Sequence, residues 1–333
     1  MNSSATQFRC RRAALLGAGL VATLALAGCA TSATSGETAA PAAGNVTLKV
    51  AVQPIADFAP IWLGVSKGIF SQQGVNVEIV PGTASSSSQI PLLSSGQADL
   101  AATTATAALQ AASQNVSVRI VGGLTTFGDT AETDQSGLIV GKGSAIKSYS
   151  DLVGKTVAVS GLKSVTQAAI MAAVDKAGGD AKGVKFIQIP MPNIANTVST
   201  GGADAGFVVD PFLGVAVSGG ATVLSHPLAD VAGGFPATSL VATKPFADKN
   251  GATLKKFTAA LATAVTYSKD HPDEVIAATA AGAKVPAEKL KGSKNPVFDA
   301  IVDPASLAKE SEMLRTYGVL DKPVDAASII WKG

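Results

Sequence analysis

The sequence predicts an α/β protein made of two similar lobes, and three observations support this fold class. Strand-like segments alternate with segments of helical periodicity along most of the chain. A pattern of strand, helix, Ser-x-Gly-x-Ala-Asp and strand occurs twice, with its aspartates at Asp99 and Asp204. The composition, 47% hydrophobic and 15% charged, is that of a globular protein. We therefore expect two βαβαβ lobes, and the alternative is one chain of several α/β units with common turn residues.

The elements follow one another in a regular order. An alternating strand over 46–52 leads through an exit loop to a helix that begins at Pro60. The first copy of the repeat then gives a strand at 74–80 and a helix opened by the hydroxyls of residues 85–88. Later strands are expected at 98–102, 116–121, 156–160, 183–189, 203–209 and 239–242, and helices at 105–112, 165–177, 272–282, 304–317 and from 252 onwards. Residues 122–137 have no period and contain three acids, which predicts a long functional loop.

The N-terminus has the polarity order of an export signal. Three arginines precede an uncharged run over residues 13–27, which is too short to span a bilayer. The run ends in Leu-Ala-Gly-Cys, which resembles the bacterial lipobox, where the cysteine carries the lipid. We expect a lipoprotein signal peptide over 1–28, lipidation at Cys29 and a flexible tether over 29–45. An ordinary signal peptide with a chance cysteine, and twin-arginine export, are the alternatives.

Cysteine usage and net charge exclude disulfides in the folded part and argue against one class of partner. The only cysteines are Cys10, inside the predicted signal, and Cys29, so the folded part can form no disulfide. Removing the three signal arginines from the 26 basic residues, against 24 acids, leaves a formal charge of −1. The basic residues are dispersed, which argues against a nucleic-acid partner.

The residue types needed for most catalytic or cofactor chemistry are missing from the sequence. Beyond the signal the chain has only His226 and His271, which lack the partners of a zinc, iron–sulfur or Cys/His catalytic site. Phosphate-loop, dinucleotide and serine-hydrolase signatures are also absent from the sequence. We expect a protein without catalytic activity, metal or cofactor.

Hydroxyl-rich strand ends that face helix starts are the candidate binding positions. Ligands of open α/β sheets bind outside the carboxyl ends of strands, where helix N-termini present unpaired N–H groups. The candidates are Gln53, Asp57, Phe58, Ser85, Ser86, Thr103 and Thr104 in the first lobe, and Ser160, Ser164, Val165, Thr166, Asp210 and Pro211 in the second. Helix capping is the alternative for the serines and for Asp210, and a solvated loop acid for Asp57. Asp99 and Asp204 are interpreted as structural, because both copies of the repeat place them at a strand start.

Several segments resemble one known family. They are Trp62-Leu-Gly-Val-Ser-Lys-Gly-Ile-Phe70, Leu93-Ser-Ser-Gly-Gln-Ala-Asp99, Asp151-Leu-Val-Gly-Lys-Thr-Val-Ala-Val159, and Ser199-Thr-Gly-Gly-Ala-Asp-Ala205 followed by Asp210-Pro211. Their order and spacing are similar to those of the nitrate/sulfonate/taurine and thiamine-precursor family of ABC-transporter solute-binding proteins. The likeness covers about residues 46–333.

The resemblance implies a type II periplasmic-binding fold, with two βα lobes, a ligand cleft and two crossovers. Lobe 1 would span 46–140 and lobe 2 141–237, and 238–333 would return to lobe 1 and add C-terminal helices. The implied function is a monomeric receptor, anchored by lipid on Cys29 to the outer face of a bacterial membrane, that delivers a small solute to an ABC permease. A thiamine-pyrimidine-synthase-like enzyme and a receptor for a membrane sensor are the alternatives.

The sequence departs from that family in the residues that would bind an anion. Arg119 and Arg315 are the only arginines after the signal, and neither falls in a predicted cleft loop, so no guanidinium clamp is evident. Asp57, Asp210 and the acids of the long loop would suit an amine or a neutral donor-rich solute. Sulfonate, nitrate, pyrimidine, amine and aromatic acid all stay open.

Overall fold

The computed structural model describes residues 45–83, 85–284, 286–290 and 293–333. These residues belong to one compact unit that begins at Gly44. The predicted signal peptide at 1–28, the lipidation at Cys29 and nearly all of the tether lie outside the described residues. Among the helices described, none has the length and apolar character needed to cross a membrane.

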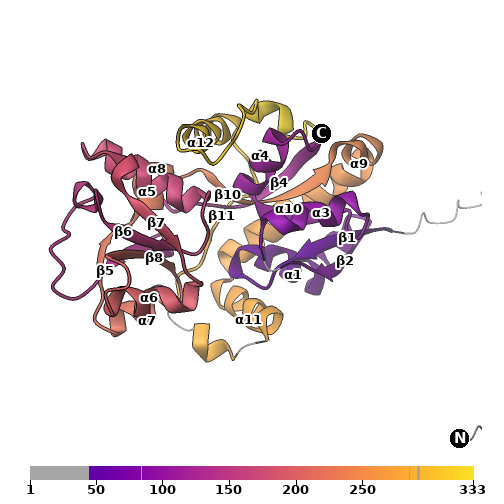
Figure 1. Ribbon diagram of the computed structural model, residues 1–333. Coiled ribbons are helices and arrows are strands. Elements are labelled where there is room, and N and C mark those ends of the chain that lie inside the picture. The colour runs from indigo at the N-terminus through magenta and orange to yellow at the C-terminus, as the bar shows by residue number, and fades with distance from the viewer. Residues whose placement is uncertain (1–44, 84, 285, 291–292) are drawn as a thin grey trace, which may run out of the picture. The chain divides into compact units, whose positions relative to one another are not determined.

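The first lobe is built on a six-stranded sheet (Figure 1). Its order is β11 (Val297–Phe298), β4 (Val118–Thr126), β10 (Pro236–Thr243), β3 (Leu100–Thr104), β1 (Val46–Val52) and β2 (Val75–Pro81). Strand β1, next to the edge strand β2, pairs in parallel with β2 and β3, whereas β10 runs antiparallel to β3 and β4. The parallel strands therefore send their carboxyl ends to one edge of the sheet.

The second lobe repeats this plan on a five-stranded sheet. Its order is β7 (Lys185–Gln188), β6 (Thr156–Val159), β8 (Ala205–Val209), β5 (Ser136–Val140) and β9 (Thr222–Ser225). The pairs β6–β7 and β6–β8 are parallel, and β5 is antiparallel to β8. Because β5 belongs to this sheet, lobe 2 already includes Ser136 and does not begin after Val140 as the resemblance implied.

The chain passes between the two sheets twice, once from β4 to β5 and once from α8 (Pro227–Ala232) to β10. The two crossing segments are hydrogen-bonded to each other. The Phe127 amide donates to the Phe235 carbonyl at 3.0 Å, and the Gly234 amide donates to the Phe127 carbonyl at 3.0 Å. This short two-stranded connection is where a hinge between the lobes would lie.

The loop expected at 122–137 is wrong at both ends, because β4 continues to Thr126 and β5 begins at Ser136. The glycines at its start are needed for packing rather than for a turn. A Cβ atom at Gly122 would lie 2.8 Å from Leu261 Cδ2, and one at Gly123 would lie 2.6 Å from the Asp299 carbonyl oxygen. The sequence pattern does not show these neighbours, since they come from the last third of the chain.

The two copies of the repeat have the same structural role in each lobe. Asp99 Oδ2 accepts a hydrogen bond from the Lys49 amide at 2.8 Å, and Asp204 Oδ2 accepts one from the Thr156 amide at 2.8 Å. Each carboxylate thus ties the start of its own strand to the neighbouring parallel strand, at the middle of β1 in lobe 1 and at the start of β6 in lobe 2. The structural interpretation of both aspartates is confirmed.

Helices cover both sheets (Figure 1). Lobe 1 carries α1 (Ala59–Ser66), α2 (Ile69–Gln72), α3 (Ile90–Ser94), α4 (Ala105–Ser113), α9 (Lys244–Lys249), α10 (Gly251–Asp270), α11 (Pro272–Ala283) and α12 (Pro304–Thr316), and lobe 2 carries α5 (Val165–Lys176), α6 (Met191–Ser199), α7 (Phe212–Ser218) and α8. The core of lobe 1 includes Phe257 of α10, stacked on Phe70 with ring centroids 5.2 Å apart. Helix α12 contacts α4 in lobe 1 and α5 in lobe 2.

Candidate functional site

A pocket of about 360 Å³ lies between the lobes. Lobe 1 contributes residues 54–57 and the end of β4, and lobe 2 contributes the end of β8 with residues 209–211. Residues 133–136 of the first crossing, the middle of α11 and residues 293–297 complete the wall. This volume is at the small end of the range for ligand pockets, which suits a small solute.

Asp57 is the charged residue on the lobe 1 wall. It lies in a short 3₁₀ helix (η1, Ala56–Phe58) that follows β1, and Thr125 Oγ1 of β4 donates a hydrogen bond to its Oδ1 at 3.1 Å. Burial raises the pKa of the Asp57 carboxyl above its ordinary value, while the Thr125 hydrogen bond acts in the opposite direction. The ionised carboxylate at this wall is therefore poorly solvated.

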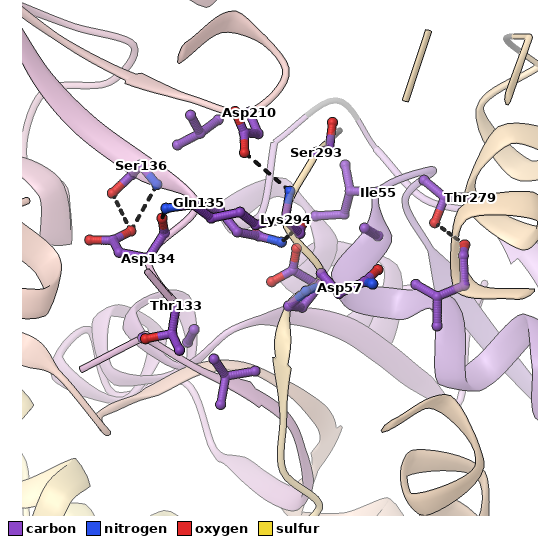
Figure 2. A pocket seen from close by; sticks show the side chains of 18 of the residues that line it. Ile55, Asp57, Thr133, Asp134, Gln135, Ser136, Asp210, Thr279, Ser293 and Lys294 are labelled. Carbon is purple, nitrogen blue, oxygen red and sulfur yellow. Dashed lines mark hydrogen bonds between the residues drawn. The ribbon is translucent and has the colours of Figure 1, made fainter. Parts of the chain in front are cut away.

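Asp210 stands on the opposite wall, at the carboxyl end of β8. Its amide donates to the Gln135 carbonyl at 2.8 Å, which fixes the residue against the first crossing segment. Its Oδ2 accepts a hydrogen bond from the Lys294 amide at 3.3 Å, a contact drawn in Figure 2. Asp57 and Asp210 thus face one pocket from different lobes.

Residues 293–297 lie at the end of the connection from α11 to β11. Hydrogen bonds of Lys294, which belongs to this segment, hold it against the first crossing segment. The Lys294 ammonium donates to the carbonyls of Ala131 at 2.5 Å and Asp134 at 2.7 Å. In return, Gln135 Nε2 donates to the Lys294 carbonyl at 2.6 Å. This segment therefore links the C-terminal third of the chain to the first crossing segment (Figure 2).

Asp134 also lines the pocket, but its carboxylate serves lobe 2. Its Oδ1 accepts from the amide of Ser136 at 2.8 Å and from the Ser136 hydroxyl at 2.6 Å. Its Oδ2 accepts from the Ala229 amide at 3.2 Å. With both oxygens engaged, this buried carboxylate holds β5 and α8 together.

Three of the predicted site residues, Asp57, Asp210 and Pro211, line the pocket. The others lie outside its lining: Gln53, Phe58, Ser85, Ser86, Thr103, Thr104, Ser160, Ser164, Val165 and Thr166. Phe58 is fully buried in the lobe 1 core, and Gln53 Nε2 donates to the Thr83 carbonyl at 2.7 Å. The predicted ligand contacts of these residues stay predictions.

Capping and contact between lobes explain where several of these residues lie. Thr104 Oγ1 accepts from the Ala107 amide at the start of α4, and Ser164 Oγ accepts from the Gln167 amide at the start of α5. The second half of α4 approaches the residues just before α5, since Gln110 Nε2 of α4 donates to the Lys163 carbonyl at 3.1 Å. The two lobes are therefore in direct contact at this point.

The sequence reasoning missed the wall made by α11 and residues 293–297. Val275, Thr279 and Lys294 line the pocket but follow no strand end and belong to no recognised motif. The acids of the long loop were a partial signal, because the Lys294 ammonium donates a hydrogen bond to the carbonyl of Asp134, which is one of those acids.

Neither of the two histidines belongs to the described pocket lining, and both have structural partners. His226 Nδ1 lies 2.7 Å from the Ser136 carbonyl oxygen, and the His271 ring stacks on Tyr267 at 3.9 Å between centroids. Within the described part of the chain, no group of three or more His, Cys, Asp or Glu residues is arranged to hold a metal.

Two α/β lobes, joined by two crossing segments and separated by a pocket, define the type II periplasmic-binding fold. The SsuA aliphatic sulphonate-binding protein of Escherichia coli shares it with a TM-score of 0.72 at 19% identity, over 86% of this chain and 98% of that one. The alkanesulfonate-binding SsuA of Xanthomonas axonopodis pv. citri, bound to MOPS, gives 0.67 at 17% identity, over 87% and 99%. The desulfurization enzyme DszB gives 0.61 at 14% identity, over 86% and 96%.

The sequence itself assigns the family. The NMT1/THI5-like family model matches residues 55–275, which is more than half of the chain. The chain belongs to the NMT1/THI5-like family. None of the curated proteins matches it.

Proposed function

We propose that this protein is a lipid-anchored extracytoplasmic receptor that captures a small organic solute between its lobes and delivers it to an ABC importer. The observation that carries the proposal is a pocket whose walls come from both lobes, with one carboxylate on each wall. Such a pocket couples ligand contact to the relative position of the lobes, as in hinged binding proteins. Two proteins with the same fold are named as sulfonate-binding proteins, which supports a solute receptor.

The anchor is part of the proposal and rests on the sequence alone. Acylated Cys29 would hold the receptor on the outer face of a bacterial membrane and raise its effective concentration near a permease. Replacing this residue, Cys29→Ala, should move the protein from the membrane fraction to the soluble fraction and abolish metabolic labelling with a fatty acid. Unchanged membrane association of the Cys29→Ala variant would argue against the anchor.

An enzyme is the competing class, because DszB has the same fold. The residues described around the pocket include neither His nor Cys, the side chains most often used for proton transfer and nucleophilic attack. This composition favours binding over turnover. A receptor that signals to a membrane sensor would have the same pocket, and adjacent permease and ATPase genes would favour the importer.

Binding and turnover can be separated in one experiment. A thermal-shift panel of sulfonates, nitrate, pyrimidines, amines and aromatic acids should give one clear class of stabiliser, since a ligand at 100 times its Kd adds about 2.7 kcal/mol to the free energy of unfolding. The stabilising compound should be recovered unchanged after incubation, as judged by mass spectrometry. A panel without any stabiliser would count against a receptor, and a converted compound would show an enzyme.

A further inference from the structure

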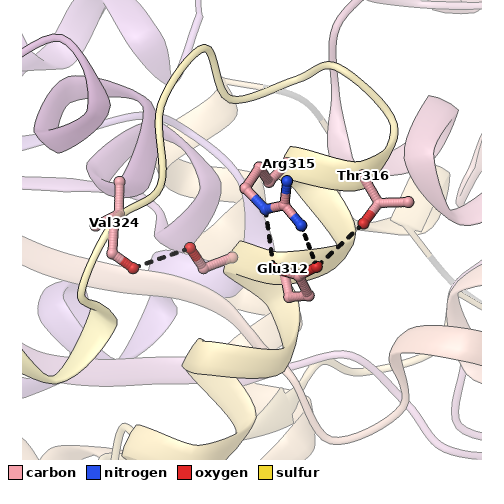
Figure 3. Close-up of polar contacts among 5 residues, drawn as sticks. Glu312, Arg315, Thr316 and Val324 are labelled. Carbon is pink, nitrogen blue, oxygen red and sulfur yellow. Dashed lines mark hydrogen bonds and ion pairs between the residues drawn. The ribbon is translucent and has the colours of Figure 1, made fainter.

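The charged side chains around the pocket are unequal in sign. Its described lining holds three aspartates, Asp57, Asp134 and Asp210, against the single cation Lys294. Neither of the two arginines after the signal contributes. Arg119 donates to the Val118 carbonyl beside it, and Arg315 pairs with Glu312 on α12 (Figure 3). A bidentate guanidinium clamp for an anion is therefore missing from the described lining.

The one cation is largely committed to the protein itself. Two of the three N–H groups of the Lys294 ammonium are used on the carbonyls of Ala131 and Asp134. This ammonium therefore holds residues 293–297 against the first crossing segment. Its one remaining N–H group could donate a single hydrogen bond to an anionic ligand, whereas a lysine without partners could donate three.

Two of the three aspartates retain capacity for a ligand. Asp134 has both oxygens engaged within lobe 2. Within the described residues, Asp57 accepts from one side chain, that of Thr125, and Asp210 accepts from the Lys294 amide at 3.3 Å. Each carboxylate can accept about four hydrogen bonds, so both have room for a donor.

Apolar side chains form another part of the wall, beside uncharged polar ones such as Thr279 and Ser293. Phe127 and Leu228 stand on the side of the crossing and lobe 2, and Val275 stands on α11. An apolar surface of this kind gains free energy by covering hydrocarbon. It also reduces the contact of the half-buried Asp57 with water, which makes an unpaired carboxylate there costly until a positive charge joins it.

We propose that the pocket selects a solute with a single positive charge, an organic ammonium on a small apolar body, held between Asp57 and Asp210. The proposal rests on the proposed receptor function and specifies its ligand class. The ammonium donates hydrogen bonds to carboxylates on both lobes. Its binding therefore favours the arrangement of the lobes in which Asp57 and Asp210 face each other. An anion of the same shape would meet two carboxylates and a lysine that is already engaged.

The test uses sets of three compounds that share a skeleton and differ in charge. Phenethylammonium, phenethyl alcohol and phenethylsulfonate form one set, and pentylammonium, pentanol and pentanesulfonate form another. Calorimetric titration of the full chain should give at least about tenfold tighter binding for the ammonium of a set than for its alcohol or sulfonate. Asp57→Asn keeps an acceptor for Thr125 and should weaken ammonium binding at least about tenfold. The matched control Asp321→Asn removes a charge from an exposed surface position and should bind as the parent does.

The pH dependence separates a charge pair from a neutral hydrogen bond. Because burial raises the pKa of Asp57, ammonium affinity should increase as the pH rises through that pKa, with Asp134, Asp210 and Lys294 as the other charged groups around the pocket. Affinity that falls with rising pH would mean that protonated Asp57 donates to an acceptor, and would overturn the proposal. Tighter binding of a sulfonate or an alcohol, or no binding of either ammonium, would also overturn it and leave the receptor function standing. The receptor function itself fails only if the wider panel gives no stabiliser.

Discussion

Glu310 on α12 offers a sharp test of the physical reasoning, because its carboxyl group is buried with a single partner. The residue is fully buried, and Thr106 Oγ1 of α4 donates to its Oε1 at 2.7 Å. Its Oε2 has no partner within the described part of the chain. Burial raises the pKa of Glu310 to about 8 from an ordinary 4.5, and the Thr106 hydrogen bond offsets part of this rise.

The sign of the pH effect follows from this rise in pKa. A folded-state pKa above the unfolded one means that the folded protein holds a proton that the unfolded chain has already released. The extra proton on Glu310 stabilises the folded state. This stabilisation is complete below the pKa of Glu310 in the unfolded chain and is lost as the pH rises through about 8. Between about pH 6 and pH 9, one such group should lower the free energy of unfolding by roughly 2–3 kcal/mol.

The perturbation is Glu310→Gln, which keeps the size and the acceptor for Thr106 but removes the titration. Urea unfolding of parent and variant at several pH values should show the decline in the parent and its loss in the variant. Glu312→Gln is the matched control on the same helix, because Glu312 is exposed and its pairing with Arg315 lowers its pKa (Figure 3). A parent and a Glu310→Gln variant with the same pH slope would refute the reasoning about the buried carboxyl.

Three further substitutions test the packing and the repeat. Gly206→Ala would place Cβ 2.4 Å from Ile194 Cγ2 and should lower the free energy of unfolding in urea by about 1–3 kcal/mol. Its control Gly214→Ala, with open space in α7, should be neutral or stabilising, and equal effects of the two substitutions would contradict the packing. Phe257→Ala removes a fully buried ring that stacks on a second aromatic, and should cost about 3–5 kcal/mol, with a small loss in the melting temperature as the contrary result. Asp204→Ala leaves the Thr156 amide without its side-chain acceptor and should cost about 1–2 kcal/mol, measured by the same unfolding assay; no change would show that the strand start is held by other contacts.

Local turn chemistry explains how much of the fold could be predicted. Gly96 and Gly201 have positive φ angles of 71° and 76°, so the Ser-x-Gly-x-Ala-Asp pattern marks the same helix end and strand start in both lobes. The two expected helices 165–177 and 304–317 end one residue from their observed bounds. Here the residues that determine the structure are close neighbours in sequence.

Contacts between distant segments explain the rest. The course of β4 past Gly122 depends on Leu261, and the pairing of β5 with β8 decides the lobe boundary. Asp57 and Asp210 could be proposed because they follow strand ends, and both line the pocket. Lys294 could not, because its place at the pocket is fixed by carbonyl groups more than a hundred residues earlier.

The wall formed by residues 293–297 bears on how this receptor could be redesigned. The segment lines the pocket but does not follow a parallel strand of either lobe. It therefore takes no part in the parallel strand pairing that fixes each lobe. Bonds through the Lys294 backbone and ammonium hold it in place, which leaves the neighbouring Ser293 and Asn295 side chains as adjustable pocket positions. A library confined to those two positions would vary the solute range while keeping both sheets and the crossing segments intact.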